Sequence, residues 1–210
     1  MNPLIIYLEP KSGLSEVKRE LKKIPCDIIC LKYMKYPDVY KVALRTVKSH
    51  SEYTHIVWVQ NDIIFNKEAF FKLCKGIKSI EGSILGASMN IDLSHHGLKK
   101  CAYTTEPFLF NETNGFIDKD PPYRDKGLDR GIIPIFHNGG VFICTREFYL
   151  RFPLRGFKET GYNADLVHGI EINANQEKYY LDTSIHLKHL RYQGKMQVGK
   201  KPIEVEFIEF

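Results

Sequence analysis

One carboxylate of this 210-residue chain directly follows an apolar segment. Asp62 comes after residues 55–59, which have the composition of a buried strand, with Gln60 and Asn61 in between. A carboxylate at the end of such a strand lies at the edge of a sheet, where it can bind Mg²⁺ or Mn²⁺ together with the phosphates of a substrate. An Asp at this position can equally form a turn by accepting hydrogen bonds from backbone N–H groups. The residues alone leave both roles open.

Two adjacent glycines form a second candidate binding site. Asn138, Gly139 and Gly140 stand between two strand-like segments, residues 132–136 and 141–144. Because glycine has no side chain, backbone N–H groups at this place can approach a ligand closely. The same three residues also suit a plain hairpin turn.

The elements that must position these residues alternate between strands and helices. Apolar runs predict strands over residues 4–8, 26–31 and 55–59, and apolar residues at helical spacing predict helices over residues 14–23 and from Asp38 onward. This alternation is typical of an α/β protein with a parallel, doubly wound sheet. Such sheets bind ligands outside the carboxyl ends of the strands, which is where Asp62 is expected.

The second part of the chain predicts shorter elements. We expect a helix after Asn66, strands over 83–89, 132–136 and 141–144, a short helix capped by Thr145, a helix over 163–176, and extended segments over 179–181, 185–190 and 203–207. Residues 106–131 contain several prolines and glycines and predict a long loop, a feature that is often functional in a compact domain. No linker or internal repeat divides the chain, so we expect a single domain over residues 1–210.

The composition is that of an ordinary globular protein, and the positive charge is concentrated in the first 50 residues. Hydrophobic residues at 43 % and charged residues at 26 % exclude a disordered chain or a coiled coil. Residues 1–50 hold ten Lys and Arg against five Asp and Glu, which accounts for the net charge of +5. We expect this part to meet an anionic partner, such as a nucleotide phosphate or a membrane surface, although a solvated lysine-rich helix face explains the charge equally well.

The sequence gives expectations about nucleic-acid binding and about the location of the protein in the cell. No continuous basic stripe with interleaved aromatic residues is present, so no nucleic acid is expected as a partner. Five cysteines without a paired CxxC spacing, and no apolar run long enough for a signal peptide or a membrane span, predict a cytoplasmic protein with no transmembrane segment. A peripheral location at a membrane surface is the alternative.

The sequence around Asp62 resembles a known family. Residues 56–65 (IVWVQNDIIF) are similar to the strand and acidic turn of nucleotide-diphospho-sugar glycosyltransferases of the GT-A fold, in which a strand runs into an Asp-any-Asp motif. Asp62 matches the second aspartate, which in the family binds the metal that bridges the diphosphate of the donor. Gln60 stands at the position of the first aspartate.

Three further segments resemble the family in the same order along the chain. Residues 136–148 (FHNGGVFICTREF) are similar to a glycine-containing turn and strand, followed by an arginine-bearing helix, that line the sugar and acceptor pocket. Residues 161–165 (GYNAD) resemble an acidic pair at a helix start, with Ala164 in place of the first acid. Residues 182–189 (DTSIHLKH) resemble a late strand that carries a histidine of the metal or diphosphate site.

The resemblance implies a Rossmann-like GT-A fold with a mostly parallel central sheet flanked by helices, in a single domain. Residues 1–65 would be its nucleotide-binding half, and residues 66–210 its acceptor-side half, in which the loop 106–131 closes over the donor. Asp165 would be the general base, with Glu159 or Glu171 as substitutes. Asp62 and His189, or His186 in its place, would hold Mn²⁺ or Mg²⁺. The residues expected to contact the nucleotide sugar are Pro10, Lys11, Lys32, Arg45, Gln60, Asn61, Asn138, Gly139 and Gly140.

The activity expected from the resemblance is a metal-assisted, inverting transfer of a sugar from a nucleotide-diphospho-sugar to a hydroxyl of a glycan, lipid or protein acceptor. One alternative is a module that binds nucleotide sugars without transferring them. Another is a different α/β nucleotide enzyme, such as a nucleotidyltransferase, for which a glycine-rich loop is expected after the first strand, where only Gly13 is found. The alternating residues 203–207 could also pair across a homodimer.

Overall fold

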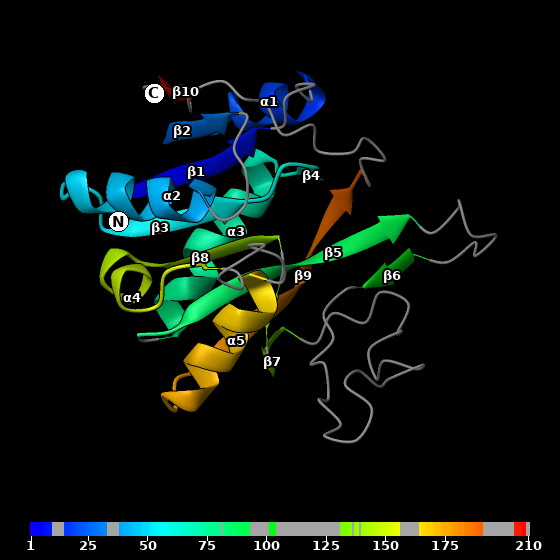
Figure 1. The fold of residues 1–210 in the computed structure, drawn as a ribbon. Helices are drawn as coiled ribbons and strands as arrows, with labels where there is room; N and C mark the ends of the chain where they lie inside the picture. Colours follow the sequence, from blue (N-terminus) through cyan, green and yellow to red (C-terminus); the bar gives the residue numbers. More distant parts are fainter. Residues whose placement is uncertain are drawn as a thin grey trace.

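A mixed sheet of ten strands forms the middle of the protein (Figure 1). The structure, a computed structural model, describes residues 1–9, 15–32, 38–80, 82–92, 101–103, 131–135, 137–138, 140–155, 164–190 and 204–208. The strands are β1 (Pro3–Glu9), β2 (Asp27–Lys32), β3 (His55–Val59), β4 (Ile63–Ile64), β5 (Ile84–Asp92), β6 (Cys101–Tyr103), β7 (Ile132–Ile135), β8 (Val141–Thr145), β9 (Tyr179–His189) and β10 (Glu204–Ile208). The helices are α1 (Ser15–Leu21), α2 (Asp38–Ser49), α3 (Lys67–Gly76), the short 3₁₀ helix η1 (Ile77–Ser79), α4 (Arg146–Arg151) and α5 (Ala164–Ala174).

The strands follow the order β10-β2-β1-β3-β8-β5-β9-β4, with β6 beside β5 and β7 beside β9. β2, β1, β3, β5 and β9 all run in one direction, and β8 is inserted antiparallel between β3 and β5. The short or peripheral strands β4, β6, β7 and β10 are antiparallel to their neighbours. The expectation of a single α/β domain with a mostly parallel central sheet and flanking helices is thereby confirmed.

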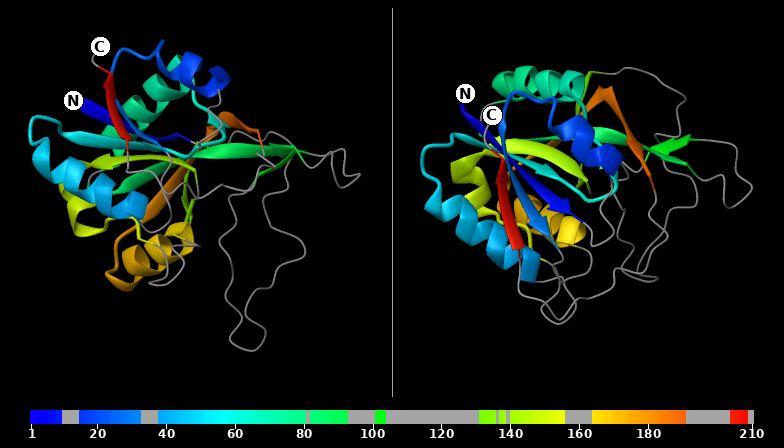
Figure 2. Two further views of the ribbon diagram at one scale, coloured as in Figure 1. Left: turned by 45° about the horizontal axis from the view of Figure 1, so that its top comes forward. Right: turned by 90° about the horizontal axis from the view of Figure 1, so that it is seen from above.

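Helices cover both faces of the sheet (Figure 2). In β1, Leu4 and Ile6 belong to the apolar cluster that packs under α2, α4 and α5, whereas Ile5 and Tyr7 belong to the cluster under α1 and α3. Successive side chains of a strand point to opposite faces, so a continuous apolar run is what a strand buried on both faces requires. This is the physical reason why residues 4–8 could be recognised as a central strand.

Side-chain caps fix where two helices begin. The Asn66 side chain accepts a hydrogen bond from the Ala69 N–H at 2.9 Å at the start of α3. Thr145 does the same for the Phe148 N–H at 3.1 Å at the start of α4. Each cap satisfies a backbone donor that has no partner within the helix, and both were predicted from the sequence.

The extended segments expected over residues 179–181 and 185–190 form the single strand β9. Its register against β5 shifts after the pair Ala87 and Asp182, so that Ser88 pairs with His186. The three residues between the two matched stretches interrupt the alternation of apolar residues, which explains why the sequence pattern suggested two segments.

The order of the strands reverses at β1, which has β2 on one side and β3 on the other. The crevice outside the carboxyl ends of such strands is the usual ligand site of an open α/β sheet. β10 pairs with β2 of the same chain and forms one end of the sheet. Within the part of the chain that is described, no helix is long and apolar enough to span a lipid bilayer.

Candidate functional site

Hydrogen bonds connect the turn that follows β3 to residues in or next to three other strands. The Gln60 N–H donates to the Gly140 carbonyl at 2.9 Å, and the Asn61 carbonyl accepts a hydrogen bond from the Tyr7 hydroxyl at 3.3 Å. The Asp62 carbonyl accepts from the Leu190 N–H at 2.7 Å. Asp62 is therefore held at the carboxyl edge of the sheet, between β1 and the end of β9, as predicted.

The structure brings Asp62 and His189 to neighbouring backbone positions. β4 pairs antiparallel with β9, and Ile63 lies opposite His189 in this ladder. Residues that are paired across an antiparallel ladder have Cα atoms about 4.5–5.5 Å apart. The backbones of Asp62 and His189, which are far apart in the sequence, thus lie near one another at one corner of the sheet.

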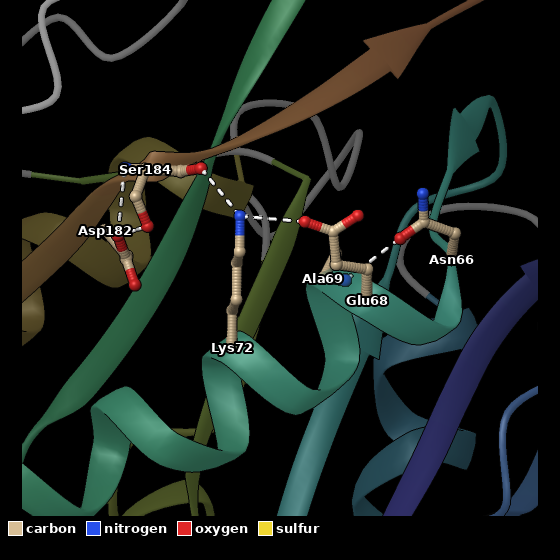
Figure 3. A network of polar contacts seen from close by, with 6 residues as sticks. All are labelled: Asn66, Glu68, Ala69, Lys72, Asp182 and Ser184. Carbon is tan, nitrogen blue, oxygen red and sulfur yellow. Dashed lines mark hydrogen bonds and ion pairs between the residues drawn. The ribbon is translucent and has the colours of Figure 1, made fainter.

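The register of β9 against β5 shifts over residues 183–185, where polar contacts link Asp182, Ser184 and Lys72 (Figure 3). The Asp182 carboxylate accepts hydrogen bonds from the Ser184 N–H at 2.9 Å and from the Ser184 hydroxyl at 2.7 Å. Lys72 on α3 donates to the Ser184 carbonyl at 3.4 Å and forms an ion pair with Glu68 at 2.9 Å. Bulges re-aim a strand, and here the first half of β9 pairs with β7 while its second half reaches β4 and Asp62.

The turn before β8 is held by a buried asparagine. Asn138 is 2 % exposed, and its Nδ2 donates to the carbonyls of Ala87 and Val141, both at 3.0 Å. A Cβ on Gly86 would lie only 2.3 Å from this Nδ2, so the asparagine depends on a glycine in β5. In the described part of the chain its Oδ1 has no hydrogen-bond partner. Gly140 follows with a φ of 140°, a conformation that favours glycine.

Asp165, the predicted base, lies in the first turn of α5 beside His137. The Nδ1 of His137 and the Oδ2 of Asp165 are 3.9 Å apart. Burial lowers the pKa of His137, and the Asp165 charge, which acts in the opposite direction, offsets only part of that effect. His137 is therefore a neutral imidazole at neutral pH, next to an accessible carboxylate.

A second buried histidine lies behind this pair. The Nε2 of His168 is 2.8 Å from the Phe152 carbonyl, and because a carbonyl can only accept, Nε2 carries the proton. Burial lowers the pKa of His168 to about 4, with the nearby His137 acting in the same direction. Neither histidine was singled out from the sequence. Two features of the sequence could have pointed to them. His137 directly precedes Asn138, and His168 lies three residues after Asp165, on the same face of the helix.

Two basic residues predicted to contact the nucleotide sugar lie in different places. Lys32 ends β2 at the same carboxyl edge, opposite Glu9 in the register with β1. Arg45 is exposed in the second half of α2, which begins after the carboxyl end of β2 and runs back toward the start of β3. The structure therefore brings Lys32 to the candidate site and does not bring Arg45 there.

The substitutes proposed for the base and the histidine also have defined positions. Glu171 forms an ion pair with Arg155 at 2.6 Å. His186 is exposed on β9. The remaining predicted positions lie outside the described residues: Pro10, Lys11, Gly139, Glu159 and residues 106–130 of the predicted loop.

The side chains that the structure describes at this edge do not form a complete metal site. No group of three or more His, Cys, Asp or Glu that could hold a metal is found among the side chains that are described. Mg²⁺ commonly takes one or two carboxylates from the protein and completes its shell with water and substrate phosphates. A single carboxylate such as that of Asp62 can serve in that mode of binding, whereas a permanently bound metal would need more ligands from the protein.

Comparison with known proteins supports the fold but identifies no family. No family model matches the sequence, and no curated protein matches it. Among solved structures, the protein is similar to one titled "Crystal Structure of A197 from STIV", with a TM-score of 0.63 and 12 % sequence identity over 90 % of this chain and 85 % of that chain. At this identity the similarity demonstrates a shared α/β fold.

Proposed function

We propose that the protein is a glycosyltransferase that moves a sugar from a nucleotide-diphospho-sugar donor to an acceptor hydroxyl with inversion. The observation that carries the proposal is the position of Asp62. It lies in the turn after β3, which is next to the point where the strand order reverses. In this segment Gln60 bonds to Gly140 and Ile63 pairs with His189. Open α/β sheets bind nucleotides at this place.

The proposed reaction is a single displacement at the anomeric carbon. Asp165 removes the proton of the acceptor hydroxyl as its oxygen bonds to that carbon. The bond from the same carbon to the diphosphate breaks, and the electron pair leaves with the diphosphate. Mn²⁺ or Mg²⁺ held by Asp62 and His189 would supply positive charge to the departing group. In this proposal residues 1–65 bind the nucleotide, residues 66–210 bind the acceptor, and the protein works in the cytoplasm.

A second candidate is a module that binds nucleotide sugars without transferring them. Gln60 and Ala164 occupy positions where the resemblance leads one to expect acids. Ala164 is 6 % exposed, so it adds no polar group to the candidate site. Transfer of sugar to any acceptor, or slow hydrolysis of the donor, would distinguish an enzyme from this module.

The first test is thermal unfolding in the presence of UDP-, GDP-, dTDP- and CMP-sugars, each with and without Mn²⁺. A ligand present at a hundred times its dissociation constant stabilises the folded state by about 2.7 kcal/mol. We expect a metal-dependent shift with donors of one nucleotide class. If no donor changes the unfolding temperature, both candidate functions are rejected.

A further inference from the structure

A buried imidazole lies behind the carboxylate that we assign as the base. The side chain of His137 is 4 % exposed and that of Asp165 is 42 % exposed. His137 belongs to the turn before β8, whereas Asp165 belongs to the first turn of α5. The carboxylate is thus open to a substrate on one side and faces the interior of the protein on the other.

We propose that His137 is a positioning residue that orients the Asp165 carboxylate for proton removal, a role that rests on the function proposed above. The 3.9 Å between Nδ1 and Oδ2 is longer than a hydrogen bond. Catalytic hydrogen bonds are often long in ligand-free proteins and tighten when the substrate binds. A small closure brings the Nδ1–H of His137 to one carboxylate oxygen and leaves the other oxygen for the acceptor hydroxyl.

The charge state of His137 suits this role. Because burial lowers the pKa of His137, the imidazole is neutral at neutral pH. A neutral donor fixes the carboxylate in place without cancelling its charge, whereas an imidazolium would make it a weaker base. During the reaction the acceptor proton passes to Asp165 and then to water, and His137 keeps its own proton.

The groups that act on His137 come from α5. Asp165 raises the pKa of His137, and His168, which is buried at its back, is also neutral at neutral pH. Glu171, further along α5, is engaged by Arg155. Asp165 is therefore the acid of this helix that His137 can orient.

Titration of the His137 ring by NMR tests the contact without any substrate. We expect the pKa of His137 to fall further in Asp165→Asn, because the carboxylate that favours the imidazolium is lost. Glu171→Gln, which removes the same charge from the same helix, should leave the pKa of His137 unchanged. An unchanged pKa in Asp165→Asn, or equal changes in the two variants, refutes the proposed contact.

Transfer kinetics with two substitutions of His137 test the positioning role. His137→Asn retains an N–H donor near the place of Nδ1, whereas His137→Phe retains the ring and removes the donor. We expect kcat to fall about tenfold or more in His137→Phe, with little change in KM for the acceptor, and to be largely retained in His137→Asn. Unfolding temperatures of both variants separate this effect from a loss of stability.

Two negative outcomes have different meanings. If the wild-type protein transfers sugar and His137→Phe is equally fast, or if both variants lose activity in proportion to their stability, the positioning role is refuted and the proposed function stands. If the wild-type protein transfers no sugar from any donor that it binds, the transferase function is rejected, and the role of His137 is rejected with it.

Discussion

The Asp62 carbonyl accepts a hydrogen bond from the Leu190 N–H at 2.7 Å, and this bond continues the short ladder between β4 and β9. It joins the turn after the third strand of the chain to the end of the ninth. Because both are held by backbone groups, the spacing between Asp62 and His189 does not depend on surface side chains.

Asp62→Asn should abolish the metal-dependent part of donor binding. The amide has the size of the carboxylate but no charge to attract Mn²⁺, so the stabilisation by saturating donor and metal should disappear. At a hundred times the dissociation constant that stabilisation is about 2.7 kcal/mol, or about 5–10 °C for a chain of this length. Thermal unfolding with and without Mn²⁺ measures it.

Asp38→Asn is the matched control for Asp62→Asn. Asp38 is an acidic residue at the start of α2, and it contributes a weak ion pair with Lys41 at 3.9 Å. The donor-dependent shift should be retained in this variant. If Asp62→Asn also keeps the full shift, Asp62 is not a metal ligand.

Tyr7→Phe should weaken donor binding through the turn after β3. Tyr7 is completely buried, and its hydroxyl donates to the Asn61 carbonyl at 3.3 Å. Loss of this hydrogen bond should cost about 1 kcal/mol in the free energy of unfolding, because a buried carbonyl loses its donor. We expect the dissociation constant of the donor to rise severalfold, as measured by calorimetric titration.

Tyr149→Phe is the control for this variant. Tyr149 is equally buried, and its hydroxyl has no hydrogen-bond partner within the described residues. Removing that hydroxyl should leave stability unchanged or raise it slightly, with no effect on donor binding. Similar losses in the two variants would contradict a specific role for the Tyr7 hydroxyl.

His168 should make the protein less stable in acid. Its pKa is about 4 in the folded state and 6.5 ordinarily, so the unfolded chain binds the proton more readily between these values. The free energy of unfolding should therefore fall as the pH drops from 6.5 to 4, by about 3 kcal/mol from this residue, and should not depend on it above pH 6.5. His137, whose pKa is also lowered, adds to the fall.

Urea unfolding at a series of pH values compares the wild type with His168→Gln. Glutamine retains an Nε2 donor for the Phe152 carbonyl but does not titrate. The difference in unfolding free energy between the two proteins should change by about 3 kcal/mol between pH 6.5 and 4. Parallel curves for the two proteins would show that His168 is not a buried neutral imidazole.

Gly86→Ala should destabilise the protein by displacing Asn138. The added Cβ would lie 2.3 Å from Nδ2, so the amide must move and give up its bonds to Ala87 and Val141. We expect a loss of about 3 kcal/mol in the free energy of unfolding. In an Asn138→Ala background the same substitution should cost much less, and additive losses in this double-mutant cycle would argue against the contact.

Local patterns in the sequence predicted most of the elements. The apolar run of residues 4–8 identified a strand buried on both faces, and Asn66 and Thr145 identified helix starts, because caps and periodicity act over a few residues. Asp62 was placed at the carboxyl edge by the same kind of argument.

The relations between distant segments could not be predicted from local patterns. The insertion of β8 between β3 and β5 depends on which strands pair, and the sequence of each strand does not determine its neighbour. Ser184 receives a hydrogen bond from Lys72 on α3, and the approach of His137 to Asp165 requires α5 to pack against the turn before β8. These contacts decide the environment of the candidate base, so His137 and His168 were missed.

The arrangement of the sheet has a consequence for synthesis on the ribosome. β1, β2 and β3 are made before β8 and β10. The two outer sides of this three-stranded unit are completed later, by β8, which pairs with β3, and by β10, which pairs with β2. β3 has no partner on its outer side until β8 has been made up to Thr145. β2 has none on its outer side until β10 has been made up to Ile208. Unpaired strand edges promote association between chains. A nascent or truncated chain that ends before β10 therefore leaves this edge of β2 uncovered, and such chains should aggregate more readily than a chain that includes β10.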